Sequence, residues 1–220
     1  MSGPALLAID SATTRVVVAL GGLDGSLLDA LDWPAGYRHG ETLMPAIADL
    51  LGRAGMDQTQ LAAVVVGTGP GAFTGLRVGI ATAKGLAHGL GCPLVGVSTA
   101  AALLAGAAPR SVLLLPAGPS DRLLIRHDSA ARLLPAGTEP DLEADETLIA
   151  VDLAERAPAD AVARGETARA GLAAALVAIG ARRMRAGDVD DLARLVPEYV
   201  TLPRGVRSES GEVAWSHDRP

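Results

Sequence analysis

The residues best placed to do chemistry begin with a carboxylate near the amino terminus. Asp10 ends an apolar run and is followed by the hydroxyl-bearing residues Ser11, Thr13 and Thr14. A carboxylate followed by hydroxyl groups in a first hairpin can hold a magnesium ion together with a phosphate group. The same residue types also cap turns through their own backbone. The sequence leaves both interpretations open for Asp10.

A glycine loop is the second candidate. Residues 67–75 read Gly-Thr-Gly-Pro-Gly-Ala-Phe-Thr-Gly and lie between a run of β-branched residues and a helical pattern. Backbone N–H groups at a helix start can hold an anion, so Gly69 and Gly71 join Asp10 as candidates for a vestigial phosphate-binding site. The loop is not a P-loop, because no Gly-Lys-Ser/Thr follows it. We favour a tight turn that seats the helix on a sheet.

Other catalytic and metal chemistry has little support. No Asp or Glu occurs in residues 58–120, so the acidic residue that a dinucleotide site needs is missing. The histidines are isolated from one another, and Cys92 is the one cysteine. We therefore expect no metal, no cofactor and no catalytic residue. A hydrolase set of Ser11, His39 and Asp10 would have to be assembled by folding.

A row of small residues marks the helix after the glycine loop. Gly75, Gly79, Ala83 and Ala87 recur every four residues and therefore lie along one face. Such a row permits close approach of another backbone, either within the fold or from a second protein. Glycine inside a helix costs about 1 kcal/mol relative to alanine, which suggests a compensating contact. We expect a protein interface there.

The first half of the chain predicts a mixed α/β sheet. Apolar runs and breaks predict strands over 5–9, 15–20, 27–33, 62–66 and 93–97, with helices over 41–54, 75–89 and 98–105. The order of strands and helices favours a β-meander feeding βαβα, with helices over the sheet.

The second half echoes the first with a weaker signal. Strands are predicted over 111–115, 122–126 and 131–134, a polar loop over 137–146, a strand end over 148–151 and one helix over 165–186. We expect an N-terminal subdomain over 1–108, a smaller C-terminal subdomain over 109–203 and a loose tail over 204–220.

Composition limits the functional classes. The formal net charge of −6 argues against a broad nucleic-acid footprint on this chain. No apolar run reaches the ~20 residues that span a bilayer, and no signal-peptide pattern is present. With one cysteine, a reduced and cytoplasmic setting is expected, without membrane association.

Three segments resemble one family. Residues 7–13 (Leu-Ala-Ile-Asp-Ser-Ala-Thr), 67–79 and 96–99 are similar to TsaB (YeaZ), a bacterial subunit of the tRNA threonylcarbamoyladenosine machinery. The similarity covers residues 5–105 and is most specific in the glycine loop. Beyond residue 110 it is thin, although Pro197-Glu198-Tyr199-Val200 resembles the closing segment of the family.

The resemblance implies a fold and a set of partners. It implies the α/β fold of the actin/Hsp70-like ATPases, with two related halves, each a mixed sheet with flanking helices, and with the second half reduced. It also implies a non-catalytic partner of TsaD, joined by the P-loop ATPase TsaE, with tRNA reached only through the complex. TsaD carries metal-binding histidines where this chain has Thr99 and Leu103.

The resemblance also suggests where the partner binds. Contact with TsaD would use the first two helices, through Leu43, Ile47 and Leu50 on the first and through the row of small residues on the second. Alone, the chain would pair with itself through the same helices. The alternative function is a small-molecule kinase or ATPase of the same fold that uses Asp10 and the glycine loop.

Overall fold

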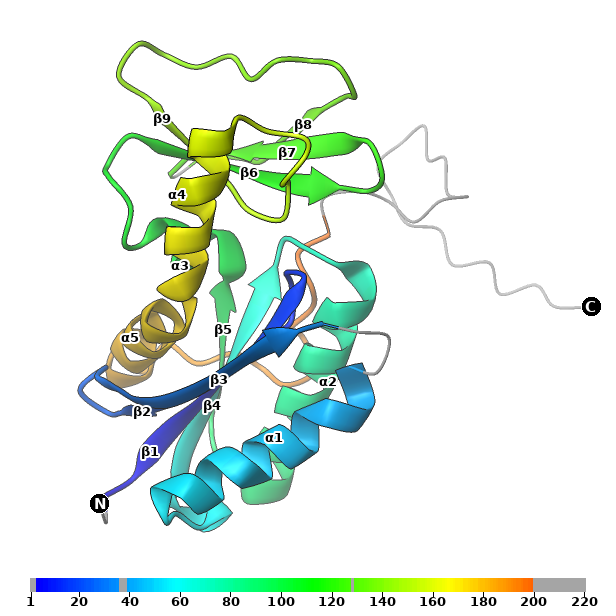
Figure 1. Cartoon of the computed structure of the whole chain (residues 1–220). Coiled ribbons are helices and arrows are strands. Elements are labelled where there is room, and N and C mark those ends of the chain that lie inside the picture. The colour runs from blue at the N-terminus through cyan, green and yellow to red at the C-terminus, as the bar shows by residue number, and fades with distance from the viewer. Residues whose placement is uncertain (1–2, 36–38, 128, 200–220) are drawn as a thin grey trace, which may run out of the picture.

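The chain folds into two β-sheets with helices around them (Figure 1). The computed structural model describes residues 3–35, 39–127 and 129–199. The five-stranded first sheet and its helices form one half, and the four-stranded second sheet lies beyond one end of it. The predicted α/β class, with two mixed sheets and a smaller second half, is confirmed.

The first sheet has the order β3-β2-β1-β4-β5. Strands β1, β2 and β3 pair antiparallel as a meander, whereas β1 pairs with β4, and β4 with β5, in parallel. This is the predicted meander followed by crossover units. The strands are β1 (Ala5–Asp10), β2 (Arg15–Gly22), β3 (Leu27–Pro34), β4 (Leu61–Gly69) and β5 (Leu94–Ser98).

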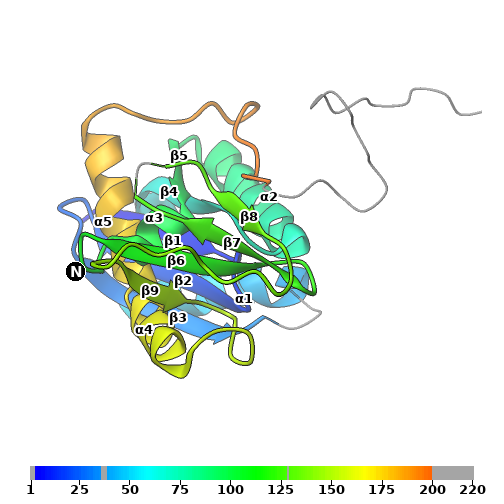
Figure 2. The same cartoon turned by 90° about the horizontal axis from the view of Figure 1, so that it is seen from above.

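Helices cover both faces of this sheet. The helices α1 (His39–Ala54) and α2 (Phe73–Leu90) pack on one face, where Leu7 and Ile9 point. The opposite face, which includes Ala8, is covered by α3 (Thr99–Leu104) and a helix from the second half of the chain. A 3₁₀ turn, η1 (Gln58–Gln60), precedes β4. Figure 2 shows this sandwich from above.

The second sheet has the order β8-β7-β6-β9. Its strands are β6 (Ser111–Ala117), β7 (Asp121–Ile125), β8 (Arg132–Leu134) and β9 (Thr147–Ala150). The helix α4 (Ala159–Ala170) packs on β9 and contributes Ala161 to a small separate core. The polar stretch before β9 is a loop, as predicted.

The prediction of one helix over 165–186 was wrong. The structure has two helices, α4 and α5 (Leu172–Arg185), which meet at Gly171. Each has its own target: Gly165 of α4 lies against the backbone of Ala150, whereas Gly180 of α5 lies against Val65 of the first sheet. Because one straight helix cannot follow both surfaces, the chain turns between them.

The chain after α4 returns to the first half. The helix α5 covers the β1, β2, β4 and β5 strands, and the segment beyond it runs along the edge of β5. The Asp190 N–H donates to the Leu94 carbonyl of β5 at 2.8 Å, and the Glu198 N–H donates to the Thr68 carbonyl at the end of β4 at 2.8 Å. The strands of the first sheet precede residue 108 and those of the second follow it, whereas α5 and the segment beyond it lie with the first sheet, and the predicted domain boundaries stay a prediction. The predicted tail over 204–220 lies outside the described residues.

No helix in the described part of the chain is long and apolar enough to cross a membrane.

Candidate functional site

Asp10 lies at the end of β1 with its carboxylate completely buried. One oxygen, Oδ1, accepts a hydrogen bond from the Ala12 N–H at 2.9 Å. The other, Oδ2, accepts from the Thr99 hydroxyl at 2.6 Å, and that hydroxyl in turn accepts from the Gly69 N–H at 3.1 Å. A methyl group on Gly67 would fall 1.8 Å from Oδ2. Asp10 therefore joins the glycine loop to the start of α3 from inside the fold.

Burial sets the proton affinity of this carboxylate. It raises the pKa of Asp10 from 3.8 to about 6, although the hydrogen bonds from Thr99 and Ala12 act in the opposite direction. In the unfolded chain the pKa of Asp10 stays at 3.8. Between pH 3.8 and about pH 6, the folded chain therefore keeps Asp10 protonated, whereas the unfolded chain has released this proton. The contribution of Asp10 to stability is therefore fully present below pH 3.8 and is lost as the pH rises toward 6.

An Asp10→Asn variant measures this effect. The free energy of unfolding of the natural chain, relative to that of the variant, is expected to fall by about 2 kcal/mol between about pH 4 and about pH 6. Asparagine has the same shape and can still accept from Ala12, but it does not titrate. Urea unfolding at several pH values checks this. A difference that stays constant with pH would show that Asp10 keeps an ordinary pKa.

The glycine loop is pressed against the turn that follows Asp10. A methyl group on Gly71 would lie 2.1 Å from the Ala12 carbonyl oxygen, and one on Gly75 would lie 2.1 Å from that of Ser11. The Ala72 N–H donates to the Ala12 carbonyl at 2.7 Å. The glycines thus serve direct backbone packing between loop and turn. This favours the tight-turn interpretation for Gly71 over a phosphate cradle.

The Ser11 side chain is buried and hydrogen-bonded, unlike an accessible nucleophile. Its buried hydroxyl donates to the Gly75 carbonyl at 2.8 Å. The side chain of His39 is not among those that the structure describes. The described side chains therefore do not form the Ser-His-Asp arrangement of a hydrolase with Asp10. Within the described residues, no group of three His, Cys, Asp or Glu side chains could hold a metal ion.

The row of small residues on α2 faces inward, which corrects the expectation of direct contact with a second protein. Gly75 and Gly79 lie against Ser11, and Ala83 and Ala87 are buried in the core of the first sheet. The predicted contact residues of α1 are buried in the same core: Leu43, Ile47 and Leu50. Small side chains here let α2 approach its own sheet closely.

Another row on α2 faces outward, two positions out of phase with the first. It consists of exposed residues at four-residue spacing, namely Phe73, Arg77, Ala81, Gly85 and Gly89. A methyl group added at Gly85 or at Gly89 would have nothing within 4 Å. Glycines on an exposed helix face destabilise the helix without an internal packing reason. This outer row was missed by the sequence analysis.

An aromatic–arginine cluster begins this outer row. The Arg77 guanidinium lies over the Phe73 ring, 3.7 Å from its centroid, and its Nε donates to the Tyr199 hydroxyl at 2.9 Å. The two rings lie 5.3 Å apart. Phe73 is the one phenylalanine in the chain, yet it is 39% exposed, and Tyr199 is 45% exposed. Exposed Tyr, Phe and Arg side chains held together are typical of protein-binding surfaces.

The comparisons with known proteins identify the family. A family model described as TsaD, tRNA N6-adenosine threonylcarbamoyltransferase, matches residues 34–179, which is more than half of the chain. The chain belongs to this TsaD-type family. TsaB from Escherichia coli is 39% identical over 102 residues, or 46% of this chain and 43% of that protein. TsaB from Bacillus subtilis is 34% identical over 100 residues, with the same coverage of 46% and 43%.

The solved structures agree with this assignment. The structure of YeaZ from Pseudomonas aeruginosa matches 90% of this chain and 100% of that one, with a TM-score of 0.69 and 25% identity. Together with the TsaB relatives, this places the chain in the TsaB (YeaZ) group of the family. The match spans less than half the length of the curated TsaB relatives.

Proposed function

We propose that this chain is a non-catalytic partner subunit in the formation of N6-threonylcarbamoyladenosine next to the tRNA anticodon. It binds a TsaD-type catalytic subunit, and a TsaE-type P-loop ATPase joins the assembly. The chain holds the catalytic subunit in a competent shape, and tRNA is reached only through the complex. The observation that carries the proposal is the match to TsaB and YeaZ, supported by the exposed outer face of α2.

The contact surface is proposed on the outer faces of α1 and α2. The two helices lie on the same side of the first sheet (Figure 1), and the TsaD model covers both of them. On α1 the exposed side chains include Met44, Ala48 and Asp49. On α2 the outer row supplies an aromatic–arginine anchor followed by Ala81 and Gly85, where a partner backbone can come close. The proposed contact surface therefore uses the same two helices that the sequence predicted. It uses their exposed faces, because the faces first expected to bind the partner are buried in the core.

The charges on this surface support pairing with a similar chain. The exposed part of α1 includes the acidic residues Glu41 and Asp49 and the basic residue Arg53, whereas α2 carries Arg77 and Lys84 without any acidic residue. In a two-fold arrangement that places α1 of one copy opposite α2 of the other, these acidic and basic residues would meet. We therefore propose that the chain pairs with itself when it is alone, through the same surface.

The residues at two key positions support a non-catalytic role. Thr99 and Leu103 stand where the resemblance would require metal-binding histidines. The Thr99 hydroxyl is engaged by Asp10 and Gly69, and Leu103 is buried in the core. Neither side chain is a zinc or iron ligand of the histidine type. The single cysteine is compatible with a reduced cytoplasmic setting for this work.

Reconstitution tests this function. Transfer of threonylcarbamoyl from its adenylate to tRNA is measured with the TsaD-type and TsaE-type proteins of the same genome, with and without this chain. Omission of the chain is expected to lower the rate at least about tenfold, and the chain alone should transfer nothing. Transfer that proceeds equally well without the chain would contradict the proposal. Hydrolysis of ATP by the isolated chain, lost in Asp10→Ala, would instead support the kinase or ATPase alternative.

A further inference from the structure

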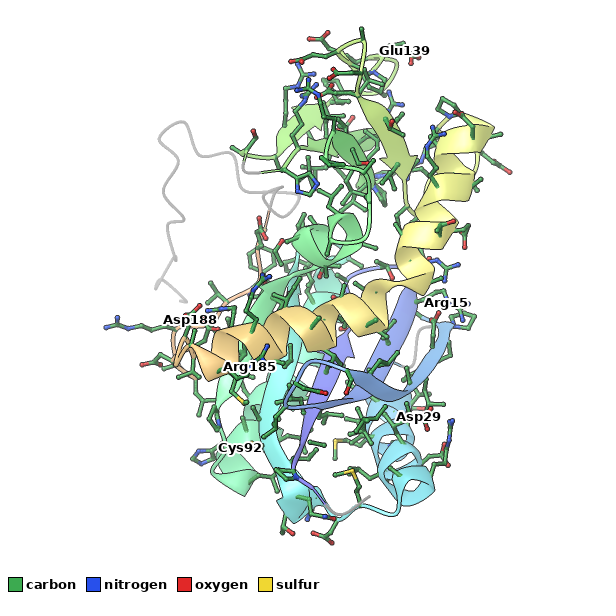
Figure 3. All side chains as sticks on the ribbon, turned by 90° about the vertical axis from the view of Figure 1, so that its left-hand side faces the viewer. Arg15, Asp29, Cys92, Glu139, Arg185 and Asp188 are labelled. Atoms are coloured by element: carbon green, nitrogen blue, oxygen red, sulfur yellow. The ribbon has the colours of Figure 1, made fainter. Side chains whose placement is uncertain are left out.

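A cavity of about 620 Å³ lies between α3, α4 and α5, a volume within the range of small-molecule sites. Figure 3 shows α4 rising from one end of α5, with α3 in the angle between these two helices. The first residues of β6 and β9, Ser111 and Thr147, close the cavity from the second sheet. The other end of β9 leads to Asp152, which accepts a hydrogen bond from the Thr14 N–H in the turn after Asp10. The cavity is therefore separate from the site around Asp10.

The apolar walls of the cavity are built from short side chains. Apart from Leu103, every apolar residue that lines it is an alanine or a glycine. The two halves share an apolar core here, which includes Leu103 of α3, Leu113 of β6 and Leu176 of α5. The short side chains leave a gap at the border of this core. Small residues alone do not indicate a ligand, but the polar residues of the cavity do.

The hydroxyl group of Ser111 is buried without a partner. Ser111 is 3% exposed, yet within the part of the chain that the structure describes its hydroxyl forms no hydrogen bond. Ser111 lies on the same face of β6 as Leu113 of the shared core, so its side chain points toward the cavity. A buried hydroxyl that lacks a hydrogen bond destabilises the fold. A bound molecule that accepts a hydrogen bond from Ser111 removes this cost.

Two further donors lie beside Ser111. Thr147 is its register partner in the parallel pairing of β6 and β9, so both side chains lie on the same face of the sheet. The Thr147 hydroxyl likewise has no hydrogen bond to a described residue. Arg164 of α4 borders the same cavity. Its Nε donates to the Leu148 carbonyl at 2.7 Å and its Nη2 to Asp160 at 2.8 Å, which leaves Nη1 without a partner among the described residues.

The charge of the lining favours an anionic head group. Among the described residues that line the cavity, Arg164 is the one charged side chain, and none is acidic. The remaining polar lining residue is Thr167, whose hydroxyl donates to the Ala163 carbonyl at 3.3 Å. A carboxylate is an acceptor of several hydrogen bonds, so one carboxylate can accept from both free hydroxyls and from the guanidinium.

We propose that this cavity binds a small amphiphilic carboxylate. The aliphatic part of the ligand lies against the alanine walls, and its carboxylate accepts hydrogen bonds from Ser111, Thr147 and Arg164. An aliphatic body fits these walls, because no aromatic side chain lines them for stacking within the described residues. The cavity does not include the outer face of α2, so the inference stands apart from the proposed contact with a TsaD-type subunit.

Decanoate binding to the full chain tests the proposal. By isothermal titration calorimetry, decanoate is expected to bind, and by NMR it should shift the amide resonances of Gly106 and Ala168, which line the cavity. Ser111→Ala should weaken this binding at least about fivefold. The same variant should raise the melting temperature by about 2–4 °C, because it removes a buried hydroxyl that has no partner. Decanol, which has the same aliphatic body without the carboxylate, should bind at least about tenfold more weakly than decanoate.

Two substitutions separate the head group from the apolar walls. Arg164→Met should weaken decanoate binding at least about tenfold, whereas Arg132→Met, which removes an exposed arginine from β8 of the same half, should bind like the natural chain. Ala175→Leu places a larger side chain from α5 into the cavity and should weaken binding at least about tenfold without lowering the melting temperature, since leucine suits a helix.

Several results would overturn the proposal. Decanoate that does not bind the natural chain would do so, as would equal affinity for the natural chain, Ser111→Ala and Arg164→Met. A fall in the melting temperature of Ser111→Ala would show that the hydroxyl has a partner in the free chain. Amide resonances of Gly106 that shift with protein concentration, without decanoate, would place a second copy of the chain in the cavity instead.

Discussion

Gly75→Ala is expected to lower the free energy of unfolding by about 3 kcal/mol, because the added methyl group meets backbone atoms rather than a flexible side chain. That methyl group would fall 2.1 Å from the Ser11 carbonyl oxygen, at the point where α2 crosses the β1–β2 turn. Either the helix or the turn must move, and the turn also carries the hydrogen bonds of Asp10 and Thr14. Denaturant unfolding monitored by circular dichroism measures the change.

Gly85→Ala is the matched control on the same helix. Nothing lies within 4 Å of the methyl group it adds, so the variant should gain about 1 kcal/mol from helix propensity alone. Opposite signs for the two variants would confirm that one row of α2 is packed inside and the other is open. Small and equal effects would show that the Gly75 contact relaxes without cost.

Ala81→Arg is expected to weaken binding to the TsaD-type subunit by at least about 100-fold while leaving the stability of the chain within about 0.5 kcal/mol. Ala81 is exposed in the middle of the outer row, between the aromatic–arginine cluster and Gly85. A long charged side chain there prevents a partner backbone from approaching. Isothermal titration calorimetry or co-purification with the partner measures the loss.

The control for this substitution is Ala163→Arg on α4. Ala163 is also an exposed helical alanine, but it lies on the second half, away from α1 and α2 (Figure 1). Binding by this variant should match that of the natural chain. If Ala81→Arg binds normally, the outer face of α2 is not the contact surface, even if the chain still supports tRNA modification.

The order of elements in the first half follows from local sequence patterns. Alternating β-branched and apolar residues define the strands, and Gly55 and Gly91 lie in left-handed conformations where the first two helices stop. The strand-ending Asp10 and the glycine loop were also found from the sequence, because an acidic residue and four glycines stand out against their apolar neighbours. What the loop does with its glycines could not be read from their spacing.

Only the tertiary structure decides which side of α2 faces the sheet. The rows beginning at Phe73 and at Gly75 have the same four-residue spacing, and both contain small residues. A signal was available: Leu76 and Ile80 directly follow Gly75 and Gly79, and one residue turns the helix by only about 100°, so the apolar stripe borders the inner row. The four-residue spacing shows that these residues share one face of α2, but the packing of α2 on the neighbouring strands determines whether that face is buried.

Contacts between residues that are far apart in the sequence cannot be predicted from local sequence patterns. The sequence by itself determined the α/β class, the strand order of the meander and the family. The fold alone brings Asp152 to Thr14, Tyr199 to Arg77 and α5 back to the first sheet. The physical reason is that each of these contacts depends on the path of the chain between its two partners. Such a path is set by packing of whole sheets and helices, which periodicity within a short window does not encode.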